Sequence, residues 1–311
     1  MSTNGIFSYE KLVVKEGYGK YKPNEFSECH VLLHHQQPEQ QVSSNALSSI
    51  GYQLDKEIKI VVGHGVTHAA CTVDLCLLTM FEGEKCTLQT KCNTELSSDD
   101  SFTLEVTLLS FVAAAELCST SYEVKLMRAV SLKELGTSAF VAGNVTAAFH
   151  KFSRSLKYLT CAAVDKSASS DVHNVLSTGT NTSDSCDPNS LNNGDVLDPS
   201  TCSLTHEDVA RLTCHCWLNL SACQLRYQNF RMAAINCSKA LGIDQHNVKG
   251  LFRRAQCYLK TGNEHAAVVD LEQALALEPG SREITRLLST ARQMTRKSDD
   301  ILAAGMSKMF R

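Results

Sequence analysis

The segment YQNFRMAAINCSKALGID, residues 227–244, aligns without gaps on the segment TGNEHAAVVDLEQALALE, residues 261–278. The offset is 34 residues, and four positions are identical: Asn229 and Asn263, Ala233 and Ala267, Ala240 and Ala274, and Leu241 and Leu275. Small residues at fixed positions let paired helices pack closely, and stacked pairs bury faces that no single pair could bury. The repeat therefore predicts an array of helix pairs in the second half of the chain.

A period of 34 residues is the length of the tetratricopeptide (TPR) repeat. Gly262 stands at the expected turn and Pro279 at the expected end of one repeat. The earlier segment LKELGTSAFVAGNVTAAFHKFSRSL fits the same frame, with Gly136 at a small-residue position and Gly143 at the turn. We predict a TPR domain at residues 116–279, with repeats at about 128–160, 206–244 and 248–279, and a C-terminal capping helix at residues 280–311.

The first two repeats are separated by a polar segment. Of the 41 residues from Asp165 to Thr205, 27 are Ser, Thr, Asn, Asp or Gly, and apolar periodicity is lost. A segment of this composition cannot bury enough apolar surface to fold by itself. We therefore predict a disordered insertion at about residues 165–205, in the loop that joins the two repeats.

The composition argues against nucleic acid and membranes as main partners. The chain is 43% hydrophobic and 20% charged, with a net charge of −3, which does not favour nucleic acid or a membrane surface as a partner. No stretch approaches the ~20 apolar residues of a membrane span. The first residues, MSTNGIFSYEKLVVKEG, lack the apolar core of a signal peptide. We expect a cytoplasmic protein, with the nucleus as a second compartment.

The chain has 14 cysteines, which are expected to remain reduced in a protein of this kind. Cys214-His215-Cys216 resembles a metal-binding motif, but no second Cys/His pair follows at zinc-site spacing. His64 and His68 are four residues apart in HGVTH, without the glutamate of a zinc-protease helix. We therefore predict no metal, no cofactor and no catalytic residue.

Lys249 and Arg253, in the stretch KGLFRRA, are four residues apart and lie on one face of the expected helix. An isolated pair of this kind is usually a solvated surface. When each repeat is numbered with its turn at position fifteen, however, Lys249 and Arg253 take positions two and six of the third repeat. Asn219 takes position six of the second repeat, and Lys133 takes position five of the first. We expect these four side chains to face one concave groove.

Lysine, asparagine and arginine side chains in one groove form a receptor for carboxylates. The set closely resembles the carboxylate clamp of TPR co-chaperones, in which a fifth position, commonly asparagine, corresponds to Thr137 here. In that family the clamp holds the C-terminal EEVD tail of the ninety-kilodalton heat-shock chaperone, and sometimes of the seventy-kilodalton one. The resemblance therefore implies a peptide-carboxylate site made of Lys133, Thr137, Asn219, Lys249 and Arg253.

The first half of the chain has a different pattern. EIKIVVG and SFTLEVTLLSF are typical of strands, and CTVDLCLLTMFEGEKCTLQT of a short helix, a turn and a strand. Strands on both sides of one short helix predict a small α+β domain with an antiparallel sheet, at about residues 1–115. The order of elements, and VDLCLLTMFEGEKCTL above all, resembles the FK-binding immunophilins (FKBPs), whose fold is a peptidyl-prolyl isomerase domain.

The aromatic pocket of that family is not matched. Val73 takes the place of the tryptophan at the start of the helix, and His35 takes the place of a strand tyrosine. The loop before the last strand, CNTELSSDD, has no aromatic residue. An isomerase of this type desolvates a twisted prolyl amide in an aromatic box, so the resemblance implies a degenerate, inactive FKBP domain.

The whole chain resembles divergent FK-binding immunophilins in which a degenerate isomerase domain precedes a TPR superhelix. That resemblance implies a non-catalytic co-chaperone that links the ninety-kilodalton chaperone to clients such as steroid receptors and a cell-cycle inhibitor. Two alternatives remain at this point. The protein could be a weakly active prolyl isomerase targeted by its TPR domain, or a TPR scaffold for an unrelated partner.

Overall fold

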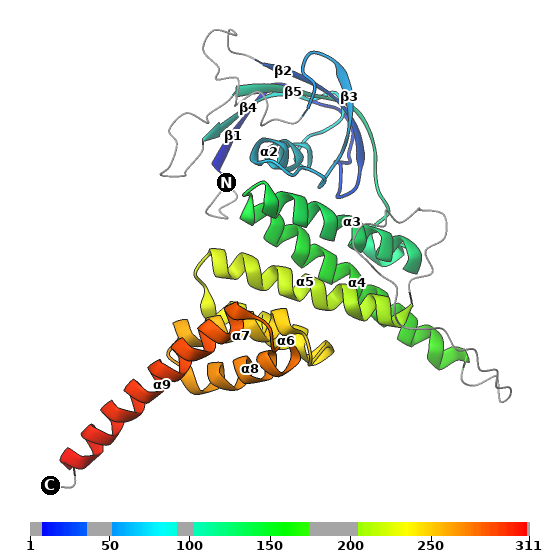
Figure 1. Cartoon of the computed structure of the whole chain (residues 1–311). Coiled ribbons are helices and arrows are strands. Elements are labelled where there is room, and N and C mark those ends of the chain that lie inside the picture. Colours follow the sequence, from blue (N-terminus) through cyan, green and yellow to red (C-terminus); the bar gives the residue numbers. More distant parts are fainter. Residues whose placement is uncertain (1–7, 36–51, 92–102, 174–204, 310–311) are drawn as a thin grey trace.

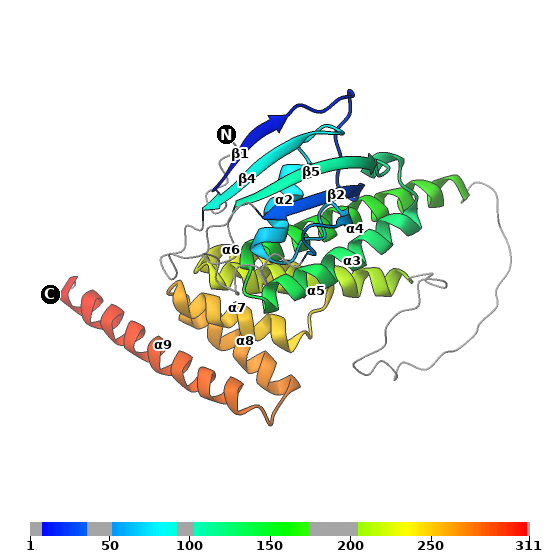
Figure 2. The same ribbon diagram turned by 90° about the horizontal axis from the view of Figure 1, so that it is seen from above.

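A computed structural model describes residues 8–35, 52–91, 103–173 and 205–309, and shows an antiparallel sheet with one helix followed by paired helices (Figure 1). The α+β fold predicted from the sequence, a sheet domain followed by an all-α TPR array, is confirmed. Figure 2 shows the sheet lying over the first helices of the array. None of the described helices is long and apolar enough to cross a membrane.

The sheet has five strands in the order β1-β4-β5-β2-β3, and all neighbours are antiparallel. Its strands are β1 (Ser8–Lys15), β2 (Glu28–His35), β3 (Glu57–Val61), β4 (Lys85–Lys91) and β5 (Thr103–Val112). Alternation along β5 fully buries Leu104, Val106 and Leu108, because successive side chains point to opposite faces of a strand. One face of the sheet therefore carries the core of this domain.

Helix α2 (His68–Leu77) covers that face and lies between the sheet and the helical array (Figure 1). Thr67 caps it, because the Thr67 side chain accepts a hydrogen bond from the amide of Ala70. The helix thus begins before Val73, which lies in its middle and not at its start as the sequence suggested. Val73 is fully buried in the core.

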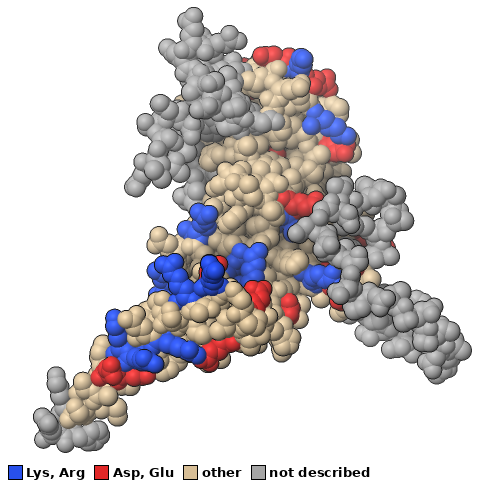
Figure 3. All heavy atoms as spheres, viewed as in Figure 1, with Lys and Arg blue, Asp and Glu red and all other residues tan. Residues whose placement is uncertain are grey.

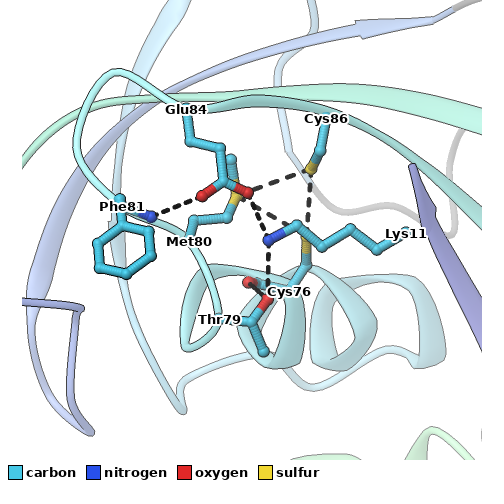
Figure 4. A network of polar contacts seen from close by, with 7 residues as sticks. All are labelled: Lys11, Cys76, Thr79, Met80, Phe81, Glu84 and Cys86. Carbon is cyan, nitrogen blue, oxygen red and sulfur yellow. Dashed lines mark hydrogen bonds and ion pairs between the residues drawn. The ribbon is translucent and has the colours of Figure 1, made fainter. Parts of the chain in front are cut away.

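A polar and sulfur-rich cluster joins the end of α2 to β1 and β4 (Figure 4). Lys11 Nζ is 2.6 Å from Glu84 Oε1 and donates to Thr79 Oγ1 at 3.0 Å. The Sγ atoms of Cys76 and Cys86 are 3.5 Å apart, and both lie 3.8 Å from the Sδ atom of Met80. The polar and sulfur contacts together join the helix to the sheet and hold the turn before β4 in place.

The helical array contains three antiparallel pairs and a final helix. Its members are α3 (Tyr122–Val141), α4 (Val145–His173), α5 (His206–Arg226), α6 (Phe230–Ile243), α7 (Val248–Lys260), α8 (Glu264–Leu277) and α9 (Arg282–Met309). The residue at each predicted turn position has a positive φ: 82° at Gly143, 57° at Gln228 and 75° at Gly262. Gly136 allows close packing within the first pair, since a Cβ there would lie 2.7 Å from the Phe152 ring.

Two boundaries differ from the sequence prediction. Helix α3 begins at Tyr122, before the predicted repeat start at residue 128, because Ser121 caps it by accepting from the amide of Val124. Helix α4 continues to His173, so residues 165–173 of the predicted disordered insertion are helical. Extending a formed helix adds one hydrogen bond per residue, so a polar sequence can continue it. The remainder of that prediction, residues 174–204, lies outside the described residues.

Candidate functional site

Helices α3, α5 and α7, the first helices of the three pairs, lie side by side. They carry the five residues that the sequence assigned to the groove: Lys133 and Thr137 on α3, Asn219 on α5, and Lys249 and Arg253 on α7. Figure 3 shows Lys and Arg side chains gathered on one face, over α5 and its neighbours. The three helices therefore place the predicted residues on adjacent elements.

Arg253 is anchored to the middle helix. Its Nη1 atom donates to the backbone oxygen of Leu218 at 2.6 Å, directly beside Asn219 in the chain. Burial lowers the pKa of the Arg253 guanidinium, although the ordinary arginine pKa is so high that the group stays charged. The structure thus brings Arg253 next to Asn219 and leaves its other N–H groups available to a ligand.

His215 lies one turn before Asn219 on α5, and its pKa indicates that Lys133 and Lys249 are near it. Burial lowers the pKa of this imidazole, and the charges of Lys133, Lys249 and Arg211 lower it further. Electrostatic effects between partly exposed groups fade over a Debye length of ~10 Å, so Lys133 and Lys249 both lie near one imidazole. The cations of the first and third repeats therefore both lie near α5, the first helix of the second repeat.

Neither groove lysine forms an ion pair with another described residue. In the described part of the chain, no carboxylate lies within 4.0 Å of Lys133, Lys249 or Arg253. Arg254, one residue further on, differs completely, because it binds both carboxylate oxygens of Asp270 at 2.8 and 2.7 Å. Among the described residues, the groove cations thus have no counter-ion, whereas the adjacent Arg254 is paired with Asp270.

Thr137 offers less than the sequence suggested. Its side chain is exposed, but its hydroxyl donates to the backbone oxygen of Lys133 at 2.9 Å in its own helix. Threonine has a single O–H donor, so only acceptor lone pairs remain for a ligand. Of the five predicted residues, Thr137 is the least suited to hold an anion.

Comparison with known proteins finds sequence similarity to immunophilins. No family model matches the chain. The chain is 28% identical to peptidyl-prolyl cis-trans isomerase FKBP4 of Bos taurus over 193 residues, which are 62% of this chain and 34% of that protein. The chain is similar to FKBP-type immunophilins.

Two further proteins are similar to parts of the chain. FK506-binding protein-like of Homo sapiens is 34% identical over 92 residues, 30% of this chain and 26% of that protein. The crystal structure of residues 1-211 of CG17282 has a TM-score of 0.47 and 18% identity, and covers 72% of this chain and 91% of that one. The FKBP-like TPR protein spans about a third or less of the length of the curated relatives it matches.

The FKBP-like domain of this protein has an aliphatic core. None of the fully buried side chains described in that core is aromatic; the aromatic residues Tyr9, Tyr52 and Phe111 pack only at its edge. Val73 is enclosed among aliphatic and sulfur-containing neighbours, and His35 ends β2, where it pairs with Leu104 of β5. The two positions that the sequence compared with aromatic pocket walls thus lie in a helix centre and at a strand end.

Sequence analysis missed His215 as a residue of the groove. The repeat register could have identified it, because His215 occupies position two of the second repeat, as Lys249 does in the third. The neighbouring Cys214 and Cys216 drew attention to metal binding instead. In the structure both thiols are buried between helices while His215 is exposed, so the three side chains do not converge.

Proposed function

We propose that the groove formed by Lys133, Asn219, Lys249 and Arg253 binds an acidic C-terminal peptide of the EEVD type, as found on the ninety-kilodalton heat-shock chaperone. The observation that carries this proposal is the set of cations around α5 that has no counter-ion in the part of the chain that the structure describes. Two carboxylates close together, an aspartate side chain and the chain terminus, would engage several of these donors at once. Charge-assisted hydrogen bonds contribute about 1.5–3 kcal/mol each.

The protein would then act as a non-catalytic co-chaperone. The aliphatic core around Val73 supports this part of the proposal, because its fully buried described residues include no aromatic side chain that could form a box around a prolyl amide. The FKBP-like domain would serve as a scaffold, and clients such as steroid receptors and a cell-cycle inhibitor follow from the family resemblance. The proposed setting is the cytoplasm, with the nucleus as a second compartment.

The peptide proposal is tested by fluorescence anisotropy with a labelled EEVD peptide. The free acid should bind, and the C-terminal amide should bind much more weakly, because the amide removes the carboxylate. Added salt should weaken binding, as expected for partly exposed ion pairs. The double variant Lys249→Ala, Arg253→Ala should abolish binding. Binding that is indifferent to both the amide and the double variant would exclude the proposed site.

A matched control separates local contacts from overall charge. Lys260 lies on α7 and is exposed, as Lys249 is, but it lies in the last turn of that helix. Lys260→Ala changes the net charge as Lys249→Ala does, and should leave peptide affinity unchanged. A separate turnover assay with a prolyl peptide tests the second part, and turnover within tenfold of an ordinary family member would show that the domain is an enzyme.

A further inference from the structure

A cavity of about 440 Å³ lies at the contact between the FKBP-like domain and the first TPR pair. Helix α2 forms one wall and α4 the other, and none of the lining residues lies on the groove helices α3, α5 and α7. Its apolar lining includes Val62, Leu75, Leu78 and Ala147. Pockets of ~300–1,000 Å³ at domain interfaces, with a few converging polar groups, are typical of small-molecule sites.

The polar end of the cavity contains Asp74 from α2. This side chain is 6% exposed, and its Oδ2 atom accepts a hydrogen bond from the amide of Gly65 at 2.8 Å. Its Oδ1 atom is buried and makes no hydrogen bond of ordinary geometry among the described residues, although the backbone of Gly63 lies close enough to lower the pKa of Asp74. Leaving a buried acceptor unpaired costs free energy, so this oxygen favours any ligand that brings a donor.

Lys151 from α4 provides the complementary group. It is also 6% exposed, and its Nζ atom donates to the backbone oxygen of Gly63 at 2.6 Å. An ammonium has three donors, so two remain after this bond. The cavity therefore has an acceptor from one domain and spare donors from the other.

Asp74 and Lys151 influence each other without forming an ion pair. Burial raises the pKa of Asp74 to about 6, and the charge of Lys151 opposes that rise. Yet no Asp74–Lys151 ion pair within 4.0 Å occurs in the part of the chain that the structure describes. A group that both accepts and donates can fill the space between them.

The other charges around the cavity are already paired. Arg154 forms an ion pair with Glu25, which neutralises both at the rim. Burial lowers the pKa of His150, so this imidazole is neutral at pH 7. Among the charged groups that line the cavity, those open to a ligand are thus the Asp74 carboxylate and the Lys151 ammonium.

We propose that this cavity binds a small apolar molecule that carries a primary carboxamide. The amide N–H donates to Asp74 Oδ1, the amide oxygen accepts from Lys151 Nζ, and the apolar body lies against Leu75, Leu78 and Ala147. A carboxylate ligand is repelled by Asp74 and an ammonium ligand by Lys151. A purely apolar ligand leaves both groups unpaired. The site is independent of the peptide groove.

The test uses the full chain and benzamide as the probe, followed by ligand-observed NMR and by the shift in melting temperature. Benzamide should bind in the millimolar range, as expected for a molecule of its size. N,N-Dimethylbenzamide, which lacks the N–H donors, and benzoate, which carries a negative charge, should each bind at least tenfold more weakly. Absence of benzamide binding, or equal binding of all three compounds, would overturn the proposal.

Two variants locate the binding. Leu75→Trp fills the cavity from a position that is 40% exposed, so the fold tolerates the change, and it should abolish benzamide binding. Leu109→Trp is the matched control, because Leu109 is 37% exposed and does not line the cavity. Benzamide binding that survives Leu75→Trp, or that is lost equally in both variants, contradicts the assignment to this cavity.

Discussion

The contact between the two domains and the groove of the TPR array use positive charge in opposite ways. At the contact, Lys151 donates to a backbone oxygen of the other domain, and Arg154 is paired with Glu25. In the groove, Lys133 and Lys249 have no counter-ion among the described residues. A cation with an internal partner holds parts of the fold together, whereas a cation without one is available to a ligand.

Replacing Arg254 should have the largest effect on stability, because Arg254 forms an ion pair with a buried carboxylate. It binds both oxygens of Asp270, a side chain that is only 4% exposed. Arg254→Ala leaves that carboxylate buried and unpaired, which should lower the free energy of unfolding by about 3–5 kcal/mol. Urea denaturation measures the change.

The double variant Arg254→Met, Asp270→Leu is the control for this prediction. It removes both charges together, so most of the lost stability should return. Equal loss in the single and double variants would mean that the arginine contributes through packing and not through its charge.

Asp74, which lines the cavity between the two domains, should make the stability of the fold depend on pH. Its pKa is raised from 3.8 to about 6 in the folded protein, so the folded state binds the proton more tightly than the unfolded state. Its contribution therefore destabilises the fold above pH 6, by up to about 3 kcal/mol, and disappears as pH falls below 3.8. Asp74→Asn should be more stable than wild type at pH 7.

The stability difference between Asp74→Asn and wild type should shrink as pH falls from 6 to 4. Chemical denaturation at several pH values provides the measurement. A difference that stays constant across this range would show that Asp74 does not titrate there.

Arg253 has no carboxylate partner among the described residues, so its replacement should mainly reduce peptide affinity. Arg253→Ala should weaken EEVD peptide binding by about 1.5–3 kcal/mol, the value of one charge-assisted contact, which is about tenfold or more. Lys133→Ala and Lys249→Ala should act similarly, and Asn219→Ala should cost less because its bond is neutral. Lys133→Ala and Lys249→Ala should change the melting temperature little, whereas Arg253→Ala also loses the hydrogen bond to the backbone oxygen of Leu218 and should lower it somewhat. A loss of stability in Arg253→Ala as large as in Arg254→Ala would show that Arg253 serves mainly to hold the helices together.

The smallest effect concerns a turn that touches neither set of cations. Gln228 has φ 57° where the other two repeats have glycine, a conformation that costs a non-glycine residue free energy. Gln228→Gly should raise the free energy of unfolding by about 0.5–1 kcal/mol and leave peptide affinity unchanged. Gly262→Ala, at the equivalent turn, should lower stability by a similar amount, and the opposite order of the two would refute the explanation.

The helix pairs were predictable from the sequence because their packing repeats every 34 residues, so each small residue supports the same register. Contacts between the domains were not predictable, since Lys151 meets Gly63 across 88 residues and no local pattern marks that pairing. The groove residues followed from the repeat register alone. His215 shared that register, but its cysteine neighbours suggested a metal site.

The placement of Val73 shows a related limit. A comparison of sequences paired it with a residue at a helix start, but Thr67 caps the helix earlier and moves Val73 to the interior. Cap geometry depends on backbone angles that the sequence pattern alone does not fix. The aliphatic character of the core was visible in the sequence, whereas the position of each side chain within it was not.

The single tryptophan of the chain, Trp217, lies on α5, with Lys239 Nζ 4.1 Å from the centre of its ring. Tryptophan fluorescence therefore comes entirely from the TPR array, and the FKBP-like domain contributes none. Circular dichroism, by contrast, follows the helices and strands of both domains. The same sample thus carries two optical reporters, and any separation between their unfolding curves measures how strongly the two domains are coupled.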